Sequence, residues 1–233
     1  MKITVFLTKE VKLVDFNIKG NPDYGHVSFN LKPGEVIMAE SGAMAYMSKN
    51  MELDSKLMGG FFKAAIRKIF TGESLLAGQY TPSSGPGEIS FSPAIPGHVG
   101  HRKLNGDKVI LQPGAFLACT PNVEINSIFG GLRAIFSGEG LFFLECSGTG
   151  DLFYNAYGAI IEKEIDGKFT VDTGHVVGWE PGIDWTIKGM GNLFSTFFSG
   201  EGLVIEFNGK GKIYLQTRFL GGFSSWLTGY IRS

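Results

Sequence analysis

Phe136-Ser137-Gly138-Glu139-Gly140-Leu141 is the stretch on which the fold prediction depends, because close copies of it occur twice more in the chain. One copy precedes it, Phe70-Thr71-Gly72-Glu73-Ser74-Leu75, and one follows it, Phe198-Ser199-Gly200-Glu201-Gly202-Leu203. Each copy is preceded by a short strand-like run ending in a turn and is followed by a Gly-x-Gly sequence. Three elements in the same order, three times, indicate internal repeats of one supersecondary unit.

The repeats have the pattern of β-structure. Apolar runs of strand length, such as Leu203-Val204-Ile205-Glu206-Phe207, lie between glycine-containing turns, as in sandwich and barrel folds. Pro33-Gly34 and Pro113-Gly114 suit type II turns. A second set of dipeptides is typical of hairpin turns, in which both central residues need positive φ; these are Asn105-Gly106, Asp166-Gly167 and Asn208-Gly209.

We therefore predict an all-β fold: one compact domain over residues 1–233, built from three tandem β repeats with short helical or apolar connectors. The strand lengths indicate a β-sandwich-like or barrel fold with pseudo-threefold character. The repeats cover about 12–100, 101–160 and 161–218, and the first carries an insertion, mostly between Met51 and Phe70. An aromatic C-terminal segment, 219–233, follows the repeats.

The composition excludes several classes of protein. Glycine supplies 34 of 233 residues without a three-residue period, which excludes collagen. A hydrophobic content of 43% with a net charge of −1 excludes a disordered chain. A net charge this small gives no overall electrostatic field that would attract nucleic acid. We therefore expect no nucleic-acid partner.

The chain contains two cysteines, Cys119 and Cys146, whose spacing fits neither a zinc site nor a redox motif. We expect both to be reduced thiols packed as small hydrophobic side chains. We expect no transmembrane helix, because no apolar run is long enough, and no signal peptide, because the apolar run near Met1 is too short for one. These observations predict a cytoplasmic protein.

Phe-rich and Gly-rich connectors precede the three copies of the repeated motif, and aromatic residues recur at helical spacing from Phe219 to Tyr230. In one interpretation these segments cap the β core or form a subunit interface. In a second, their aromatic rings and cations contact a membrane surface. In a third, they bind a lipid or another apolar ligand. The candidate membrane or partner contacts are Phe61, Phe62, Lys63, Arg67, Phe129, Leu132, Phe194, Phe223 and Trp226.

No residue pattern of a known catalytic set is present, and we predict neither an enzyme nor a cofactor. The sequence lacks the Gly-x-Ser-x-Gly of a nucleophile elbow and the His-x-His of a cupin metal site. His98 and His101 are weak metal candidates in a glycine-rich stretch. A second weak set, Glu73, Glu139 and Glu201, would converge on a pseudo-threefold axis as oxygen ligands for Ca²⁺ or Mg²⁺.

Four stretches together resemble the altered-inheritance-of-mitochondria (mitochondrial biogenesis) family, a bacterial and mitochondrial family of unknown function: Pro33-Gly34-Glu35, residues 40–47, Gly59-Gly60 ahead of 70–75, and residues 111–118. The resemblance spans about residues 12–218. It implies a double-stranded β-helix fold similar to that of the tryptophan RNA-binding attenuator protein, duplicated inside one chain. It also implies no established activity or catalytic residues in bacterial members. Mitochondrial relatives are linked to inner-membrane organisation, so the resemblance leaves open a peripheral position at the inner membrane. RNA and tryptophan binding are not carried over, since a shared fold does not determine function.

The sequence thus predicts a non-enzymatic, homo-oligomeric interaction or scaffold protein, with a membrane surface or another protein as its partner. The alternative is a β-helix protein that binds a small molecule or a metal, of which a cupin-like enzyme is the least favoured form.

Overall fold

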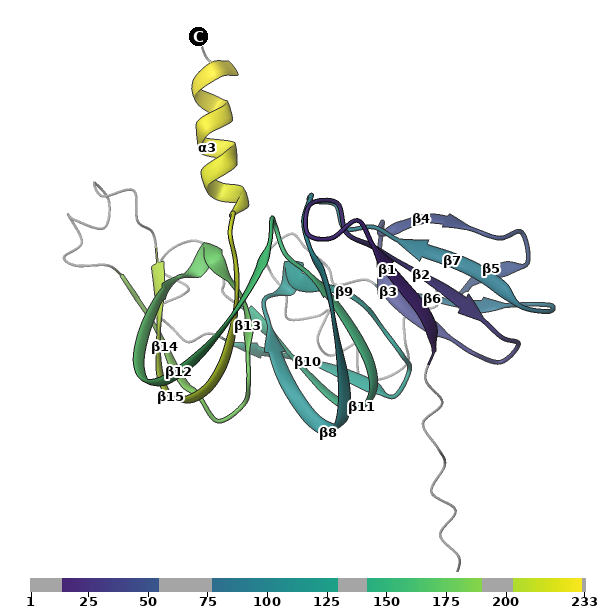
Figure 1. Ribbon diagram of the computed structural model, residues 1–233, viewed down its shortest axis with the longest axis horizontal. Helices are drawn as coiled ribbons and strands as arrows, with labels where there is room; N and C mark the ends of the chain where they lie inside the picture. The colour runs from purple at the N-terminus through teal and green to yellow at the C-terminus, as the bar shows by residue number, and fades with distance from the viewer. Residues whose placement is uncertain (1–13, 55–76, 130–141, 190–202, 232–233) are drawn as a thin grey trace, which may run out of the picture.

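The computed structural model describes residues 14–54, 77–129, 142–189 and 203–231, which fold mainly as β-strands followed by one C-terminal helix (Figure 1). The strands of the first part are β1 (Asp15–Lys19), β2 (His26–Leu31), β3 (Ile37–Glu40), β4 (Met44–Met47), β5 (Met51–Asp54), β6 (Ala77–Pro82) and β7 (Gly87–Phe91). Those of the remainder are β8 (Val99–Leu111), β9 (Phe116–Cys119), β10 (Val123–Phe129), β11 (Phe142–Asn155), β12 (Ile160–Asp172), β13 (Val176–Trp179), β14 (Asp184–Gly189) and β15 (Leu203–Gln216).

The strands form two sheets in which every ladder is antiparallel, so the prediction of an all-β fold is confirmed. One sheet has four strands in the order β1-β2-β7-β4. The other has eleven, with the path β12-β15-β13-β8-β11-β9-β3-β6-β5, while β10 pairs with β11 and β14 pairs with β15. In Figure 1 the four-stranded sheet lies at one end of the molecule and the β12–β15 ribbon lies at the other.

The core consists of three clusters of buried side chains. In the first, Phe29 of β2 packs edge-on against Phe153 of β11 with ring centroids 4.9 Å apart, which joins the two sheets. The second surrounds Phe116 and Leu152, and the third surrounds Trp179 and Phe207. β9 and β13 are buried at every residue. Because successive side chains alternate between the faces of a strand, Phe153 of β11 belongs to the first cluster and its neighbours Leu152 and Tyr154 belong to the second.

Two long antiparallel ribbons, β8–β11 and β12–β15, bend sharply rather than ending at the predicted hairpins. Asn105-Gly106, Asp166-Gly167 and Asn208-Gly209 lie inside β8, β12 and β15, so the prediction of hairpin turns there was wrong. Gly167 pairs with Gly209 across the second ribbon, at φ +105° and φ +142°. The glycines of these dipeptides do have positive φ, as the sequence predicts. They lie at bends within continuous ribbons and not at hairpin turns.

The two predicted Pro-Gly turns differ from each other. Gly34 has φ +84° and Glu35 N–H donates to Lys32 O at 2.9 Å, as expected of a type II turn. Pro113 instead begins a short 3₁₀ helix, η1 (Pro113–Ala115), in which Gly114 does not take positive φ. A type II turn at that position is therefore a wrong prediction.

Residues 99–155 and 160–216 share one order of elements: a long strand, a 3₁₀ turn, two shorter strands and a second long strand. The 3₁₀ turn of the second stretch is η3 (Thr173–His175). In both, the last residue of the final strand donates a side-chain amide hydrogen bond to the glycine of the 3₁₀ turn: Asn155 to Gly114 O at 3.1 Å and Gln216 to Gly174 O at 2.7 Å. In residues 15–91 the corresponding stretch is divided into seven strands, β1 to β7, so the threefold repetition stays a prediction.

The C-terminal segment forms helix α3 (Leu220–Ile231), which confirms the helical spacing of its aromatic residues. Figure 1 shows α3 standing away from the β-structure, with its first turn at the end of β15 and no strand beside its axis. Of the predicted connectors, residues 55–76, 130–141 and 190–202 lie outside the described residues.

Candidate functional site

Helix α3 separates its side chains by size. At 3.6 residues per turn, the six large apolar residues occupy one half of the helix surface; they are Leu220, Phe223, Trp226, Leu227, Tyr230 and Ile231. We call this half the aromatic face. All six are exposed, with 39–74% of their surface accessible, and no residue of α3 is buried.

The opposite half of α3 holds only glycine, serine and threonine, and the helix has no charged residue. Two of its hydroxyls bond back to the helix: Ser224 Oγ donates to Gly221 O at 3.0 Å and Thr228 Oγ1 donates to Ser224 O at 2.7 Å. Such back-bonding reduces the polarity that these side chains offer to solvent. The helix therefore has an apolar face without the charged face that usually keeps a surface helix in water.

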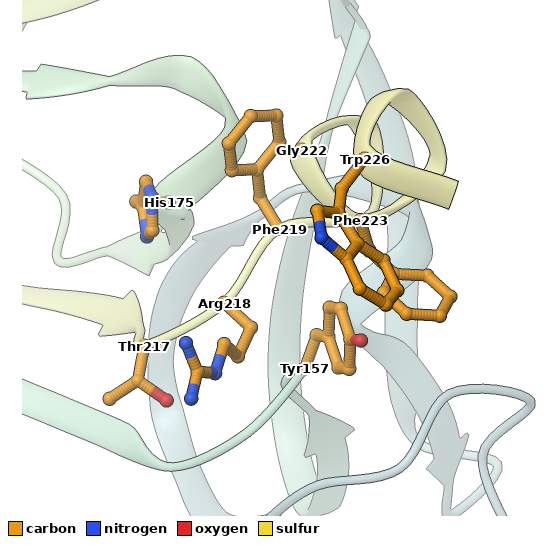
Figure 2. A pocket seen from close by; sticks show the side chains of 8 residues that line it. All are labelled: Tyr157, His175, Thr217, Arg218, Phe219, Gly222, Phe223 and Trp226. Atoms are coloured by element: carbon orange, nitrogen blue, oxygen red, sulfur yellow. The ribbon is translucent and has the colours of Figure 1, made fainter. Parts of the chain in front are cut away.

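Four aromatic rings form a continuous row from the β-structure along α3. Tyr157 meets Phe223 edge-on at 6.4 Å, Phe223 stacks on Trp226 at 5.9 Å, and Trp226 lies 4.9 Å from Tyr230. Figure 2 shows the first three of these side chains gathered on one side of the helix. Contacts between rings at these distances are favourable, and they link the exposed aromatic face to the β-structure through Tyr157.

Phe219 holds the first turn of α3 against η3. Its ring lies 5.3 Å from the imidazole of His175, and a β-carbon added at Gly174 would come within 2.7 Å of it. Added β-carbons at Gly221 and Gly222 would each come within 2.8 Å of the same ring. Because glycine has no β-carbon, Gly174, Gly221 and Gly222 leave room for the Phe219 ring.

Hydrogen bonds from Gln216 fix the surface under the helix. Its buried side chain accepts from Tyr157 N–H at 2.9 Å and donates to Gly174 O, while its carbonyl accepts from His175 Nδ1–H at 2.7 Å. Thr217 Oγ1 accepts from Ala159 N–H at 3.0 Å. These bonds join the start of β12, the turn η3 and the end of β15 into one rigid base.

A hollow of about 430 Å³ lies between this base and the foot of the aromatic face (Figure 2). One charged group lines it, the guanidinium of Arg218, and no carboxylate does among the described lining residues. The salt bridges within the described part of the chain do not include Arg218. The lining consists of Tyr157, His175, Thr217, Arg218, Phe219, Gly222, Phe223 and Trp226.

Of the predicted contact residues, the structure brings Phe223 and Trp226 together at this hollow. Phe129 lies in β10 opposite Phe142 of β11. The others fall outside the described residues, as do the three repeat glutamates; these are Phe61, Phe62, Lys63, Arg67, Leu132, Phe194, Glu73, Glu139 and Glu201.

The two histidines considered as metal ligands have separate roles. His101 Nε2 lies 2.8 Å from Oδ1 of the buried Asp151, and its ring packs 4.6 Å from Phe16. His98 precedes β8 and is partly buried; burial lowers its pKa and the nearby charge of Glu162 opposes that shift. Among the described residues, no group of three or more His, Cys, Asp or Glu side chains could hold a metal ion.

Cys119 and Cys146 are free and buried, as predicted. Burial raises the pKa of the Cys146 thiol to about 12, and it raises the pKa of Cys119 well above its ordinary value. Both side chains therefore remain protonated at neutral pH and lack the thiolate needed for nucleophilic chemistry.

Sequence reasoning missed four lining residues: Tyr157, His175, Thr217 and Arg218. They come from two separate chain segments and from the end of β15, and no spacing in the sequence relates them. The only local signal was the position of Arg218 directly before the aromatic segment.

No helix in the described ranges has the length and apolar character needed to cross a bilayer.

Comparisons with known proteins agree with this description. The chain is 31% identical to an uncharacterized protein of Streptococcus pyogenes serotype M6, over 97% of this chain and 96% of that protein. It also matches the X-ray crystal structure of a Streptococcus pyogenes protein with a TM-score of 0.79 and 30% identity, over 93% of this chain and 99% of that one. The family model described as mitochondrial biogenesis AIM24 matches residues 16–218, up to two residues before α3 begins. The resemblance noted in the sequence is thus confirmed, and the chain belongs to the AIM24 mitochondrial biogenesis family.

Proposed function

We propose that this protein is a non-enzymatic, self-associating scaffold whose helix α3 is a docking surface. The observation that supports this proposal best is the exposure of six large apolar side chains on a helix without any charge. Exposed apolar surface of this extent on a soluble domain marks a site of interaction. The β-structure acts as a rigid base, and the aromatic face contacts the partner.

The size of α3 indicates that one helix alone binds weakly. Its 12 residues span roughly 18 Å at 1.5 Å per residue, with a diameter of about 10 Å. A stable protein interface buries about 800 Å² on each partner, which is more than one face of so short a helix can supply. Several copies joined in one assembly would present several helices at once, and this multivalency raises the overall affinity.

Strand β4 is the surface that we propose for self-association. It is an edge of the four-stranded sheet, and all four of its residues are exposed, including Met44, Tyr46 and Met47. An edge strand offers unpaired backbone groups that a second chain can extend. Apolar side chains beside that edge would be buried by the same contact, which supports a homo-oligomer.

We also propose that the chain is one domain of three copies of a β unit, related to the double-stranded β-helix of the tryptophan RNA-binding attenuator protein. The shared element order of residues 99–155 and 160–216 supports this interpretation for two of the units. A cytoplasmic location, peripheral to the inner membrane, is the setting in which such a scaffold would act.

The lining of the hollow supports a role in binding rather than catalysis. Among the described residues it holds one histidine, with no carboxylate or thiol beside it to form an acid–base or nucleophile–base pair. The hollow itself is what favours the alternative of a small-molecule-binding protein, because its aromatic walls and single cation suit an anionic ligand with an apolar part.

Light scattering after gel filtration tests self-association. We expect a mass above the 25.3 kDa of one chain, and we expect the double variant Met44→Lys/Met47→Lys to elute as a monomer, since charges on an edge strand oppose pairing. Tyr24→Lys is the matched control, because Tyr24 is also an exposed large side chain but lies in the connection between β1 and β2, and β7 separates β2 from β4 in the sheet. A wild-type protein that elutes as a monomer at micromolar concentration would show that the self-association proposal is wrong.

A further inference from the structure

We infer that the hollow at the foot of α3 binds the anionic headgroup of a phospholipid at a bilayer surface, while the aromatic face lies at the boundary between headgroups and acyl chains. This inference rests on the proposed role of α3 as a docking surface and names its partner. Three properties of the site support it: its charge, its polar groups and its continuity with the aromatic row.

The charge of the site suits an anion. Arg218 is exposed, and the ion pairs of the described residues leave its guanidinium without a carboxylate. The positive end of the α3 dipole lies at the same place, because the helix begins at Leu220 and has no acidic residue in its first turn. A guanidinium offers several donors in a plane, and it binds phosphate oxygens in pairs.

Further polar groups lie around Arg218 in positions to bind phosphate or glycerol oxygens. The Thr217 hydroxyl accepts from Ala159 N–H and keeps its own hydrogen for donation. Because His175 donates through Nδ1 to a carbonyl, Nε2 of the neutral ring is an acceptor, and it can receive a hydrogen bond from a glycerol hydroxyl. Both side chains line the hollow together with Arg218 (Figure 2).

The apolar part of the site distinguishes a lipid from free phosphate. Phe223 and Trp226 line the hollow, and the row continues to Tyr230 along the helix. A ligand held at Arg218 would therefore extend its apolar part over aromatic rings. Tryptophan and tyrosine favour the membrane interface because each combines an apolar ring with a polar group.

The dimensions of α3 suit the bilayer surface. A length of roughly 18 Å is well short of the ~30 Å hydrocarbon thickness, so the helix can lie in the interface but cannot cross the membrane. It stands away from the β-structure (Figure 1), which leaves its aromatic face accessible to a flat surface. A second α3 helix would be a poorer partner, because it has no carboxylate to offer Arg218.

Vesicle co-sedimentation tests this inference with the full chain. We expect the wild-type protein to bind vesicles containing phosphatidylglycerol more tightly than vesicles of phosphatidylcholine alone. Arg218→Gln should weaken binding to the anionic vesicles about fivefold, the effect typical of one cation near an anionic surface, and should remove the preference. Phe223→Ser/Trp226→Ser should lose binding to both kinds of vesicle.

Matched variants control for charge and for aromatic surface. Lys103→Gln removes an exposed cation of β8, and Tyr24→Ser removes an exposed ring from a turn; both should bind like wild type. Far-UV circular dichroism should show the same fold for every variant. Emission from Trp226, the most exposed of the three tryptophans, should shift to shorter wavelength with anionic vesicles, and Trp226→Phe should abolish the shift.

Two results would overturn the inference. One is equal or absent binding of wild type to the two kinds of vesicle. The other is a thermal shift with inorganic phosphate that Arg218→Gln abolishes, without any vesicle binding, which would identify a free-phosphate site. Because the oligomer mass is measured separately by light scattering, a failure of lipid binding and a failure of self-association are distinguishable.

Discussion

At the scale of single residues, Arg102 links distant parts of the large sheet. Its Nη1 donates to Tyr214 Oη at 2.8 Å and to Glu180 Oε1 at 3.3 Å, and its Nη2 donates to Asp107 Oδ2 at 2.8 Å. Burial alone would lower the pKa of Arg102, but Asp107, Tyr214 and Glu180 together outweigh burial and raise it. The guanidinium thus stays charged in a half-buried position that joins β8 to β15.

The carboxylate of Asp107 makes the stability of the protein depend on pH. Its hydrogen bond from Arg102 is the main cause that lowers the pKa of its carboxyl. A carboxyl with a lowered folded-state pKa stabilises the protein above its unfolded-state pKa, about 3.9, and loses that contribution as pH falls through the folded-state value. Asp107→Asn should therefore be less stable than wild type at pH 7, by less than about 1 kcal/mol because the pair is partly exposed.

The difference between wild type and Asp107→Asn should shrink as the pH is lowered from 5 to 2.5, in urea unfolding measured at each pH. Asp23→Asn is the control, since Asp23 is exposed and forms no ion pair with the described residues. A difference for Asp107→Asn that is constant across this range would contradict the assigned role of the carboxylate.

At the scale of elements, the bend of the β8–β11 ribbon depends on glycines with positive φ. Gly106 of β8 has φ +88° and Gly148 of β11 has φ +113°, where the pairing register shifts between Ser147 and Thr149. A β-carbon at Gly106 would meet open space, whereas one at Gly148 would collide with the carbonyl oxygen of Asn122. The two positions share the same backbone requirement but differ in steric room.

Alanine substitutions at these glycines separate strain from collision. Gly106→Ala should lower the free energy of unfolding by about 1–2 kcal/mol, the usual cost of positive φ for a residue with a β-carbon. Gly148→Ala should lower it by clearly more, since the Asn122 backbone must also move. Urea unfolding measures the change in the free energy of unfolding for each variant. Equal decreases for Gly106→Ala and Gly148→Ala would show that the backbone of Asn122 moves away from the new β-carbon without added strain.

At the scale of the whole molecule, the three core clusters lie within the β-structure and α3 contributes to none of them. The helix is held by Phe219 on η3 and by the contact of Phe223 with Tyr157. Its removal would uncover little apolar surface of the β-structure. The three core clusters and the proposed docking surface therefore lie in different parts of the chain.

A chain that ends at Phe219 should fold with a free energy of unfolding within about 1 kcal/mol of the full chain, as expected for removal of an exposed element. Ile205→Ala is the contrasting variant, because Ile205 is fully buried in β15 and its truncation should cost about 2–5 kcal/mol. Urea unfolding followed by circular dichroism measures both. A large loss on removal of α3 would mean that the helix packs on the β-structure in solution.

The site could be predicted only in part. Helical spacing identified Phe223 and Trp226, because residues three and four apart share one face of a helix. Asn208-Gly209 illustrates why local signals fail for the fold. Positive φ is needed both at a hairpin turn and at a bend in a long ribbon, and only the pairing of Gly209 with Gly167 distinguishes them. In the same way, nothing local relates Tyr157 and His175 to Arg218, since strand pairing brings them together.

Composition and short sequence periods were therefore enough to predict the all-β class, the buried thiols and the helical character of the last segment. The tertiary structure decided which turns became bends, which charged groups met around Arg102, and where a hollow formed beside Arg218. It also decided that the aromatic face of α3 stays exposed. Periodicity shows which side chains share a face of a helix, but only the packing of the whole chain determines what covers that face.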